Sequence, residues 1–191
     1  VPAYLAAKDI RIDVPILGPL TVDVAYGGNF YAIVEPQGAY NGLDALGASG
    51  LLNLSPLIRS AVREVFEPVH PLDATIRGVS HVLWTDEPMN DAADARNAVF
   101  YGDKAIDRSP CGTGTSARLA HLAAKGELGA GDRFVHESYI GSRFTGRIEN
   151  VTTLGDVPAI IPSIEGSAIS TGFNTIWIDR ADKFWEGFQV S

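Results

Sequence analysis

The segment Cys111–Lys125, Cys-Gly-Thr-Gly-Thr-Ser-Ala-Arg-Leu-Ala-His-Leu-Ala-Ala-Lys, decides how this chain is interpreted. Its later part, from about Thr115 to Lys125, predicts a helix, and Gly126 supplies the left-handed residue that ends it. Small or apolar residues occupy nearly every face, and only three residues interrupt them: Arg118, His121 and Lys125. A helix that is apolar almost all round is buried. We therefore expect this helix to begin inside the protein or at the floor of a cleft.

The start of this helix carries residues that suit chemistry. Cys111 precedes the first turn, where the helix dipole favours a thiolate. Glycines at 112 and 114 let the backbone approach a ligand closely, and nearby hydroxyls can cap the helix or bind oxygen atoms. These hydroxyls belong to Thr113, Thr115 and Ser116. The first amides of a buried helix need an acceptor, and a bound carboxylate would serve.

A carboxylate precedes the cysteine by four residues. Asp107 can reach the same pocket if Ser109-Pro110 turns the chain. Cys111 is the only cysteine, which excludes an intrachain disulfide and suits a reducing cytoplasm. A lone cysteine is either a small buried hydrophobe or a reactive thiol. The acid, the glycine-rich turn and the buried helix start favour the reactive thiol.

A dinucleotide site is the first alternative. Gly112, Gly114 and Ala117 satisfy the pattern G-x-G-x-x-G/A, and Asp132 follows at the expected distance. That pattern requires a buried strand running directly into the turn. The residues before Cys111 are Asp-Arg-Ser-Pro, which are polar and broken by proline. The context argues against nucleotide binding.

A cysteine hydrolase is the second alternative, with Cys111 as nucleophile and a histidine as base. The candidates are His70, His81, His121 and His136. We expect His121, on the buried helix, to make a structural hydrogen bond. The spacing of the histidines and acids matches no zinc or iron site, so we expect no metal and no cofactor.

The composition limits the partners. The chain has 191 residues, 46% apolar and 20% charged, with net charge −8 and mean hydropathy +0.07. These values predict one large domain, or a domain with an appendage, that can fill a core. No Lys/Arg block and no run of 18 apolar residues occurs, so nucleic acid and membrane are not expected partners. The chain begins at Val1 without methionine, so we expect it to be part of something longer.

Strands outnumber helices in the hydropathy pattern. We expect one helix from Ser55, the N-cap, to Glu64 with Pro56 at its first position, and a loop over residues 36–53. The tight turn Tyr26-Gly27-Gly28-Asn29 separates two early strands. The expected strands are 10–14, 20–24, 30–34, 74–84, 97–101, 133–137, 142–148, 159–164 and 170–179. Without regular strand–helix alternation, an α+β domain fits best.

The segment Asp107-Arg-Ser-Pro-Cys111-Gly-Thr-Gly-Thr-Ser-Ala-Arg resembles the second catalytic cysteine motif of the proline racemase family. That family includes proline racemases, 4-hydroxyproline 2-epimerases and trans-3-hydroxyproline dehydratases. Further similar segments are Val24–Val34, Ile76–Val82, Phe134–Phe144 and Ser170–Thr175. The resemblance implies a diaminopimelate epimerase-like α+β fold, in which a mostly antiparallel curved sheet surrounds a buried central helix.

The chain also departs from the family pattern. Family members carry a first catalytic cysteine in a Met-Cys-Gly-His-Gly motif, and this chain has none. The resemblance therefore implies that residues 1–191 are the C-terminal portion of a two-domain racemase, mainly one α+β domain. Terminal strands would belong to the missing N-terminal domain, which holds the other half of the active site. We expect the chain alone to be inactive.

The resemblance implies a cofactor-independent reaction with two thiols on opposite faces of the substrate α-carbon. One thiolate abstracts the proton and the other thiol returns one, and Cys111 would be the second of this pair. The amides of Gly112 and Thr113 are candidates to stabilise the growing carboxylate charge. Asp107 is similar to the residue that binds the substrate ammonium group. Tyr101 aligns with an aromatic residue that packs over the ring.

The resemblance also bears on the substrate. The dehydratases of the family carry threonine at the position of Cys111, so cysteine favours racemisation or epimerisation. The similarities at Ile76–Val82 and Phe134–Phe144 favour 4-hydroxyproline, with proline as the alternative. A module that binds a carboxylate without turning it over is the non-enzyme alternative. The expected partners are a small imino acid, the missing N-terminal half and a second copy in a homodimer. The expected location is the cytoplasm.

Overall fold

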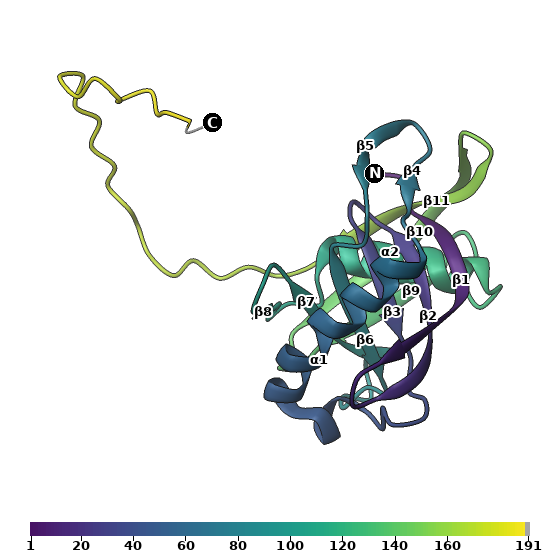
Figure 1. Ribbon diagram of the computed structural model, residues 1–191. Helices are drawn as coiled ribbons and strands as arrows, with labels where there is room; N and C mark the ends of the chain where they lie inside the picture. Colours follow the sequence, from purple (N-terminus) through teal and green to yellow (C-terminus); the bar gives the residue numbers. More distant parts are fainter. Residues whose placement is uncertain (190–191) are drawn as a thin grey trace.

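The computed structural model describes residues 1–189, which form one α+β body followed by an extended segment (Figure 1). Strands outnumber helices, as the sequence predicts. The helices are α1 (Leu43–Val65) and α2 (Gly112–Ala124). The strands are β1 (Tyr4–Val14), β2 (Gly18–Tyr26), β3 (Phe30–Val34), β4 (Val69–His70), β5 (Asp73–Arg77), β6 (His81–Asp86), β7 (Ala95–Tyr101), β8 (Ala105–Ile106), β9 (Arg133–Ser138), β10 (Arg143–Leu154) and β11 (Val157–Glu165).

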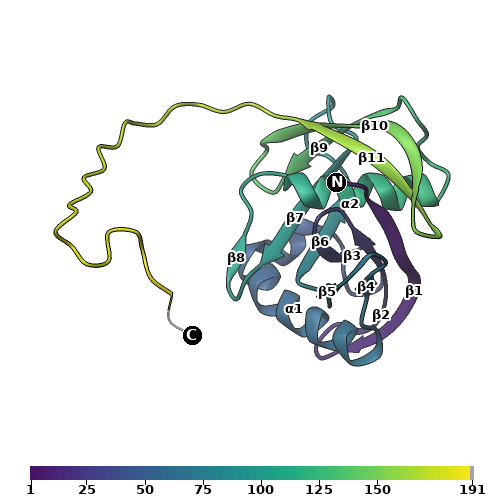
Figure 2. The same cartoon turned by 90° about the horizontal axis from the view of Figure 1, so that it is seen from above.

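One large sheet organises the body. Its strand order is β1-β2-β3-β6-β7-β9-β10-β11, with β8 paired to β7. Most pairs are antiparallel, and β3–β6 and β7–β9 are parallel. The two ends of this order meet, because Ala3 and Ile160 exchange backbone hydrogen bonds of 2.9 and 2.8 Å. Figure 2 shows α2 between β10–β11 and the strands β2 and β3, and α1 on the opposite side of β3 and β6.

The helix predicted from the opening segment is confirmed. α2 begins at Gly112, three residues earlier than expected, and nine of its thirteen residues are buried. Gly126 follows it with a φ of +76°. Leu119, Ala120 and Leu122 pack with Phe134 and Ile148 of the sheet. α2 is buried from Gly114 to Leu122, and its first two residues are half-buried, which fits the sequence expectation of a helix that begins at the floor of a cleft.

The strand β3 packs against both helices, one on each face of the sheet. All five of its residues are buried. Tyr31 and Ile33 pack toward α2 with Ala117. Phe30, Ala32 and Val34 pack in the other core with α1. Alternate side chains of a strand point to opposite faces, so a strand between two helices is apolar throughout.

The first helix is longer than predicted. The expected loop over residues 36–53 and the expected N-cap at Ser55 are wrong, because α1 already begins at Leu43. A kink at Gly47, with φ 63° and ψ 173°, divides the helix. Gly47 and Gly50 weaken the helical signal of this stretch, and burial of Leu51 and Leu54 in the core outweighs local propensity. Tertiary packing decides the helix here.

Ser55 lies inside α1. Its Oγ donates to the carbonyl of Leu51 at 2.6 Å and accepts from Trp84 Nε1 at 2.8 Å. Trp84 is fully buried. The serine therefore satisfies the indole N–H and does not cap a helix.

Two further strand predictions are corrected. The strand expected over 74–84 is divided into β5 and β6, since Gly78 adopts a φ of +75°. The strand expected over 170–179 does not form within the described residues. Residues 166–189 contain no helix or strand and extend away from the body (Figure 1), with Phe173 and Trp177 almost fully exposed. A strand needs a neighbour for its backbone groups, and none lies beside this segment.

Within the described residues, neither helix combines the length and hydrophobicity that crossing a bilayer requires.

Candidate active site

The turn before α2 joins the predicted acid to the predicted thiol. Oδ1 of Asp107 accepts hydrogen bonds from the amide and hydroxyl of Ser109, at 2.8 and 2.9 Å. Ser109 Oγ accepts in turn from the amide of Cys111 at 3.1 Å. The turn at Ser109-Pro110, on which the reach of Asp107 depends, therefore forms. Oδ2 of Asp107 accepts no hydrogen bond from residues 1–189, which leaves it available to a ligand.

Cys111 is half-buried and caps α2 with its side chain. Its φ of +66° lies in the left-handed region, which is costly for any residue except glycine. Sγ accepts from the amide of Gly114 at 3.4 Å, and the Cys111 carbonyl accepts from Thr115 N at 2.8 Å. The amides of Gly112 and Thr113 donate no hydrogen bond within the part of the chain that the structure describes. Both remain free for an anion beside the sulfur.

A tyrosine that sequence reasoning missed reaches the same sulfur. Tyr31 Oη lies 3.3 Å from Cys111 Sγ and 2.5 Å from Thr113 Oγ1. The side chain is fully buried. Burial, reinforced by the neighbouring Cys111, raises the pKa of Tyr31 well above its ordinary value of 10. The phenol therefore stays protonated. A tyrosine within an otherwise apolar buried strand needs a partner for its hydroxyl, and that was the available signal.

Tyr101 joins this group through a stack of rings. Its ring lies 6.3 Å from that of His81 with an interplanar angle of 20°, and His81 packs on Tyr31 at 4.8 Å. Burial lowers the pKa of His81, as does the charge of Arg59, while Asp107 opposes this shift. The stack places Tyr101, which is partly exposed, at the outer end of the site. It does not contact Cys111.

A buried polar cluster holds the peptide bond before Cys111. The Pro110 carbonyl accepts from Asn97 Nδ2 at 2.8 Å and from Thr115 Oγ1 at 3.3 Å. His136 Nδ1 lies 3.0 Å from Thr115 Oγ1 and 3.3 Å from Asn97 Nδ2. Complete burial lowers the pKa of His136 to about 3, and the charge of Arg118 adds to this. The imidazole is therefore neutral near pH 7.

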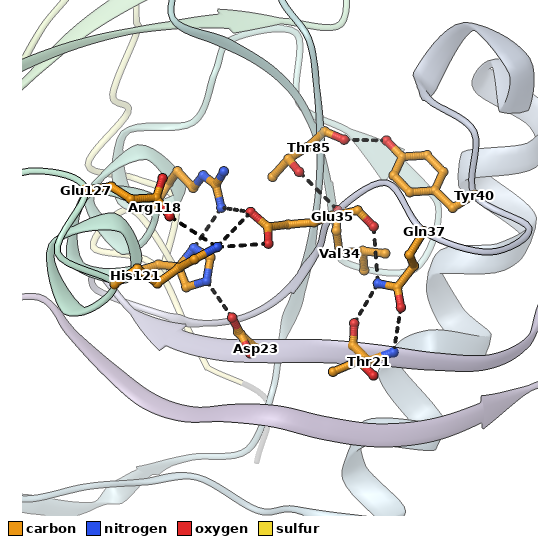
Figure 3. A network of polar contacts seen from close by, with 11 residues as sticks. Thr21, Asp23, Val34, Glu35, Gln37, Tyr40, Thr85, Arg118, His121 and Glu127 are labelled. Carbon is orange, nitrogen blue, oxygen red and sulfur yellow. Dashed lines mark hydrogen bonds and ion pairs between the residues drawn. The ribbon is translucent and has the colours of Figure 1, made fainter.

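An ion-pair network fixes the body of α2 against β2 and β3 (Figure 3). Arg118 Nη1 donates to Glu35 Oε1 at 2.8 Å and to His121 Nδ1 at 2.7 Å. Since an arginine can only donate, Nδ1 accepts, and Nε2 donates to Asp23 Oδ2 at 2.6 Å. Lys125 completes the network at Glu35. The structural role expected for His121 is confirmed.

The contacts of Cys111 bear on the hydrolase alternative. Its sulfur has hydrogen-bond partners at Tyr31, Thr113 and Gly114, and none of the four histidines is among them. No group of three or more potential metal ligands occurs within residues 1–189. The dinucleotide pattern also fails in structure, because the five-residue turn from Asp107 to Cys111 separates the short strand β8 from α2.

A surface cavity of about 840 Å³ lies beside this site, and Cys111 is not among the residues that line it. It meets the turn only at Arg108 and Ser109, and β9 to β11 supply most of its other walls. The cavity and the cluster of reactive side chains around Cys111 therefore lie at different places on the body. The groups suited to chemistry lie at the start of α2, where the thiol of Cys111 and the amides without an acceptor among residues 1–189 are joined to Asp107 by the turn.

Comparison with known proteins decides the family. The family model described as proline racemase matches residues 1–189. This chain belongs to the proline racemase family. It is 56% identical to the 4-hydroxyproline 2-epimerase of Shewanella loihica and to the 4-hydroxyproline epimerase of Brucella ovis, and each alignment covers the whole chain. The resemblance stated from the Cys111 segment is confirmed.

Solved structures of the family share this fold. A hydroxyproline epimerase from Agrobacterium vitis, with bound trans-4-hydroxy-L-proline, matches at a TM-score of 0.82 and 34% identity. A probable proline racemase from Agrobacterium radiobacter, with bound carbonate, matches at 0.83 and 35%. Both matches cover all of this chain but only 54% and 55% of the solved chains. The chain likewise spans 57% of each of the two epimerases named above.

Proposed function

We propose that this chain supplies one of the two thiols of a cofactor-independent epimerase that acts at the α-carbon of 4-hydroxyproline. The reaction interconverts trans-4-hydroxy-L-proline and cis-4-hydroxy-D-proline. One observation carries the proposal: half-buried Cys111 caps the buried helix α2, the first two amides of that helix have no acceptor among residues 1–189, and a hydrogen-bonded turn links the cysteine to Asp107. The 56% identity to proteins named 4-hydroxyproline epimerases supports the substrate.

Each group has a role in this proposal. The amides of Gly112 and Thr113 hold the substrate carboxylate, where negative charge grows as the α-proton leaves. The free oxygen of Asp107 binds the substrate ammonium group, and Tyr101 covers the ring. Cys111 acts as the base from one face, or as the acid that returns a proton to it. The second thiol must come from the other face of the α-carbon and therefore from outside this chain.

The proposal extends to the domain arrangement. Residues 1–165 form one α+β body of the diaminopimelate epimerase type, with the sheet curved around α2. Residues 166–189 leave that body with large apolar side chains exposed, among them Ile169, Phe173 and Trp177. Such side chains need a surface to cover them. We assign this segment to the domain that carries the first thiol, as the C-terminal part of a two-domain enzyme.

Deuterium incorporation tests the function. The full-length protein is incubated in D₂O with trans-4-hydroxy-L-proline, and α-deuteration and product are followed by NMR and chiral chromatography. We expect α-deuteration and product formation in the wild-type protein. We expect Cys111→Ser to abolish product formation from either epimer, because each direction of the reaction uses the two thiols. Faster turnover of L-proline would favour a proline racemase. Saturable binding of hydroxyproline without any deuteration would contradict the epimerase and favour the alternative of a module that binds a carboxylate without turning it over.

A further inference from the structure

Three hydrogen-bond donors surround the sulfur of Cys111. The amide of Gly114 lies at 3.4 Å, the hydroxyl of Tyr31 at 3.3 Å and the hydroxyl of Thr113 at 3.7 Å. Gly114 and Thr113 belong to the same turn as the cysteine, so their positions follow from the helix start. Tyr31 comes from β3, eighty residues earlier in the chain. Its contact with the sulfur depends on the tertiary fold.

The fold holds this hydroxyl in place. The ring of Tyr31 is fully buried among Ala25, Ile33, Leu83 and Ala117, and it packs on the ring of His81. A ring enclosed on this many sides has one direction for its hydroxyl, toward the start of α2. The hydroxyl reaches two acceptors there, Cys111 Sγ and Thr113 Oγ1.

Two hydrogen-bond patterns are available to these three groups. When Cys111 is a thiolate it can only accept, so Tyr31 donates to the sulfur and Thr113 donates to Tyr31. When Cys111 is a thiol, the phenol turns to donate to Thr113 Oγ1, and the S–H is free for the substrate. No proton leaves Tyr31 in either pattern, which agrees with a phenol that stays protonated. Only the O–H bonds of Tyr31 and Thr113 rotate.

We propose that Tyr31 is a catalytic residue whose hydroxyl stabilises the Cys111 thiolate by a hydrogen bond and releases the sulfur when it carries a proton. The inference rests on the proposed function for its catalytic meaning. The underlying contact between phenol and sulfur can be tested without any substrate.

The experiment uses full-length protein and compares Tyr31→Phe with Tyr40→Phe. Tyr40 is also fully buried and donates one hydrogen bond, to the carbonyl of Thr85, but has no contact with Cys111. The rate at which iodoacetamide alkylates Cys111 is followed by mass spectrometry of the peptide that contains it. Kinetic constants with trans-4-hydroxy-L-proline and thermal unfolding are measured in parallel.

We expect Tyr31→Phe to slow alkylation at pH 7 by about threefold to tenfold, because a smaller thiolate fraction is partly offset by a more nucleophilic sulfur. At a pH that ionises the thiol in both proteins, the variant should react at least as fast as wild type. If Tyr31→Phe only loosened the packing, the difference in alkylation rate between variant and wild type would keep the same sign at both pH values. Tyr31→Phe should also lower kcat more than it raises KM, while Tyr40→Phe matches wild type in both assays.

Equal alkylation profiles for wild type and Tyr31→Phe would overturn the inference, whatever the protein catalyses. If the order of the two alkylation rates reverses with pH but the protein catalyses no epimerisation, the phenol–thiolate contact is supported and the proposed function is rejected. If Tyr31→Phe does not fold, 3-chlorotyrosine is placed at position 31, where it keeps the hydroxyl and makes it a stronger donor. Alkylation at pH 6 should then be faster than in wild type, and an unchanged rate would count against the proposal.

Discussion

Gly27, in the turn between β2 and β3, lies directly against Thr113 in the first turn of α2. A Cβ at position 27 would overlap the carbonyl oxygen of Thr113 and the amide nitrogen of Ala117. At Gly28 it would come within 2.7 Å of Thr113 Cγ2. The Gly-Gly pair therefore does more than turn the chain: it lets the strand approach the helix that carries Cys111.

Gly27→Ala is expected to destabilise the fold by about 1–3 kcal/mol, because backbone atoms must move to admit the methyl group. The displaced turn carries Cys111, so kcat of the full-length protein in the proposed epimerase reaction should fall as well. Urea unfolding and steady-state kinetics measure the two effects. Gly129→Ala is the control, since a Cβ there meets only Asp132 at 3.7 Å. Equal stability of both variants would show that the close approach carries no cost.

The burial of His136 predicts loss of stability in acid. Its pKa is about 3 in the folded state and about 6.5 when unfolded, so the unfolded chain binds the proton more readily between these values. This contribution is complete above pH 6.5 and is lost as the pH falls toward 3. Between pH 7 and pH 5 the loss is about 2 kcal/mol. Urea unfolding at pH 7 and pH 5 should show this loss of unfolding free energy in wild type and a smaller loss in His136→Gln. Identical losses in the two proteins would contradict the prediction.

Thr115 tests the cluster that holds the peptide bond before Cys111. Thr115→Val keeps the shape but removes the hydroxyl between Pro110 O and His136 Nδ1. Leaving buried polar groups unpaired costs about 1–3 kcal/mol, and a loosened carbonyl should lower kcat with little change in KM. Thr115→Ser keeps the hydroxyl and should recover most of kcat. If serine and valine variants behave alike, the hydroxyl has no part in placing the thiol.

The sequence allowed prediction of the start of α2, its burial, the turn at Asp107 and most strands, because these follow from local patterns and from a specific motif. It did not reveal the helix from Leu43, where glycines mask a helix that packing on the sheet stabilises. It suggested a strand over 170–179 that has no neighbour among the described residues. Tyr31 and Asn97 were missed as site residues, and His136 was named only as a candidate hydrolase base, because their roles arise from contacts between distant strands and α2, which periodicity does not encode.

The network of Figure 3 includes Asp23 of β2, and it predicts that Asp23 contributes more to stability than Asp13, an exposed residue of β1. Asp23 Oδ2 accepts from His121 Nε2, and its Oδ1 accepts from the amide of Asp9 at 2.8 Å. Burial opposes ionisation here, but these hydrogen bonds outweigh it and lower the pKa of Asp23. Asparagine has a single acceptor oxygen, so Asp23→Asn sets an N–H group against one of the two donors.

We expect Asp23→Asn to reduce the free energy of unfolding by about 1–3 kcal/mol, the cost of an unpaired polar group in a half-buried site. Asp13→Asn, on the exposed face of β1, should change it by less than about 0.5 kcal/mol. Because Asp23 anchors the middle of α2 and not its first turn, Asp23→Asn should leave the alkylation rate of Cys111 near the wild-type value under conditions where both proteins are folded. A large change in that rate would mean that the network reaches the thiol.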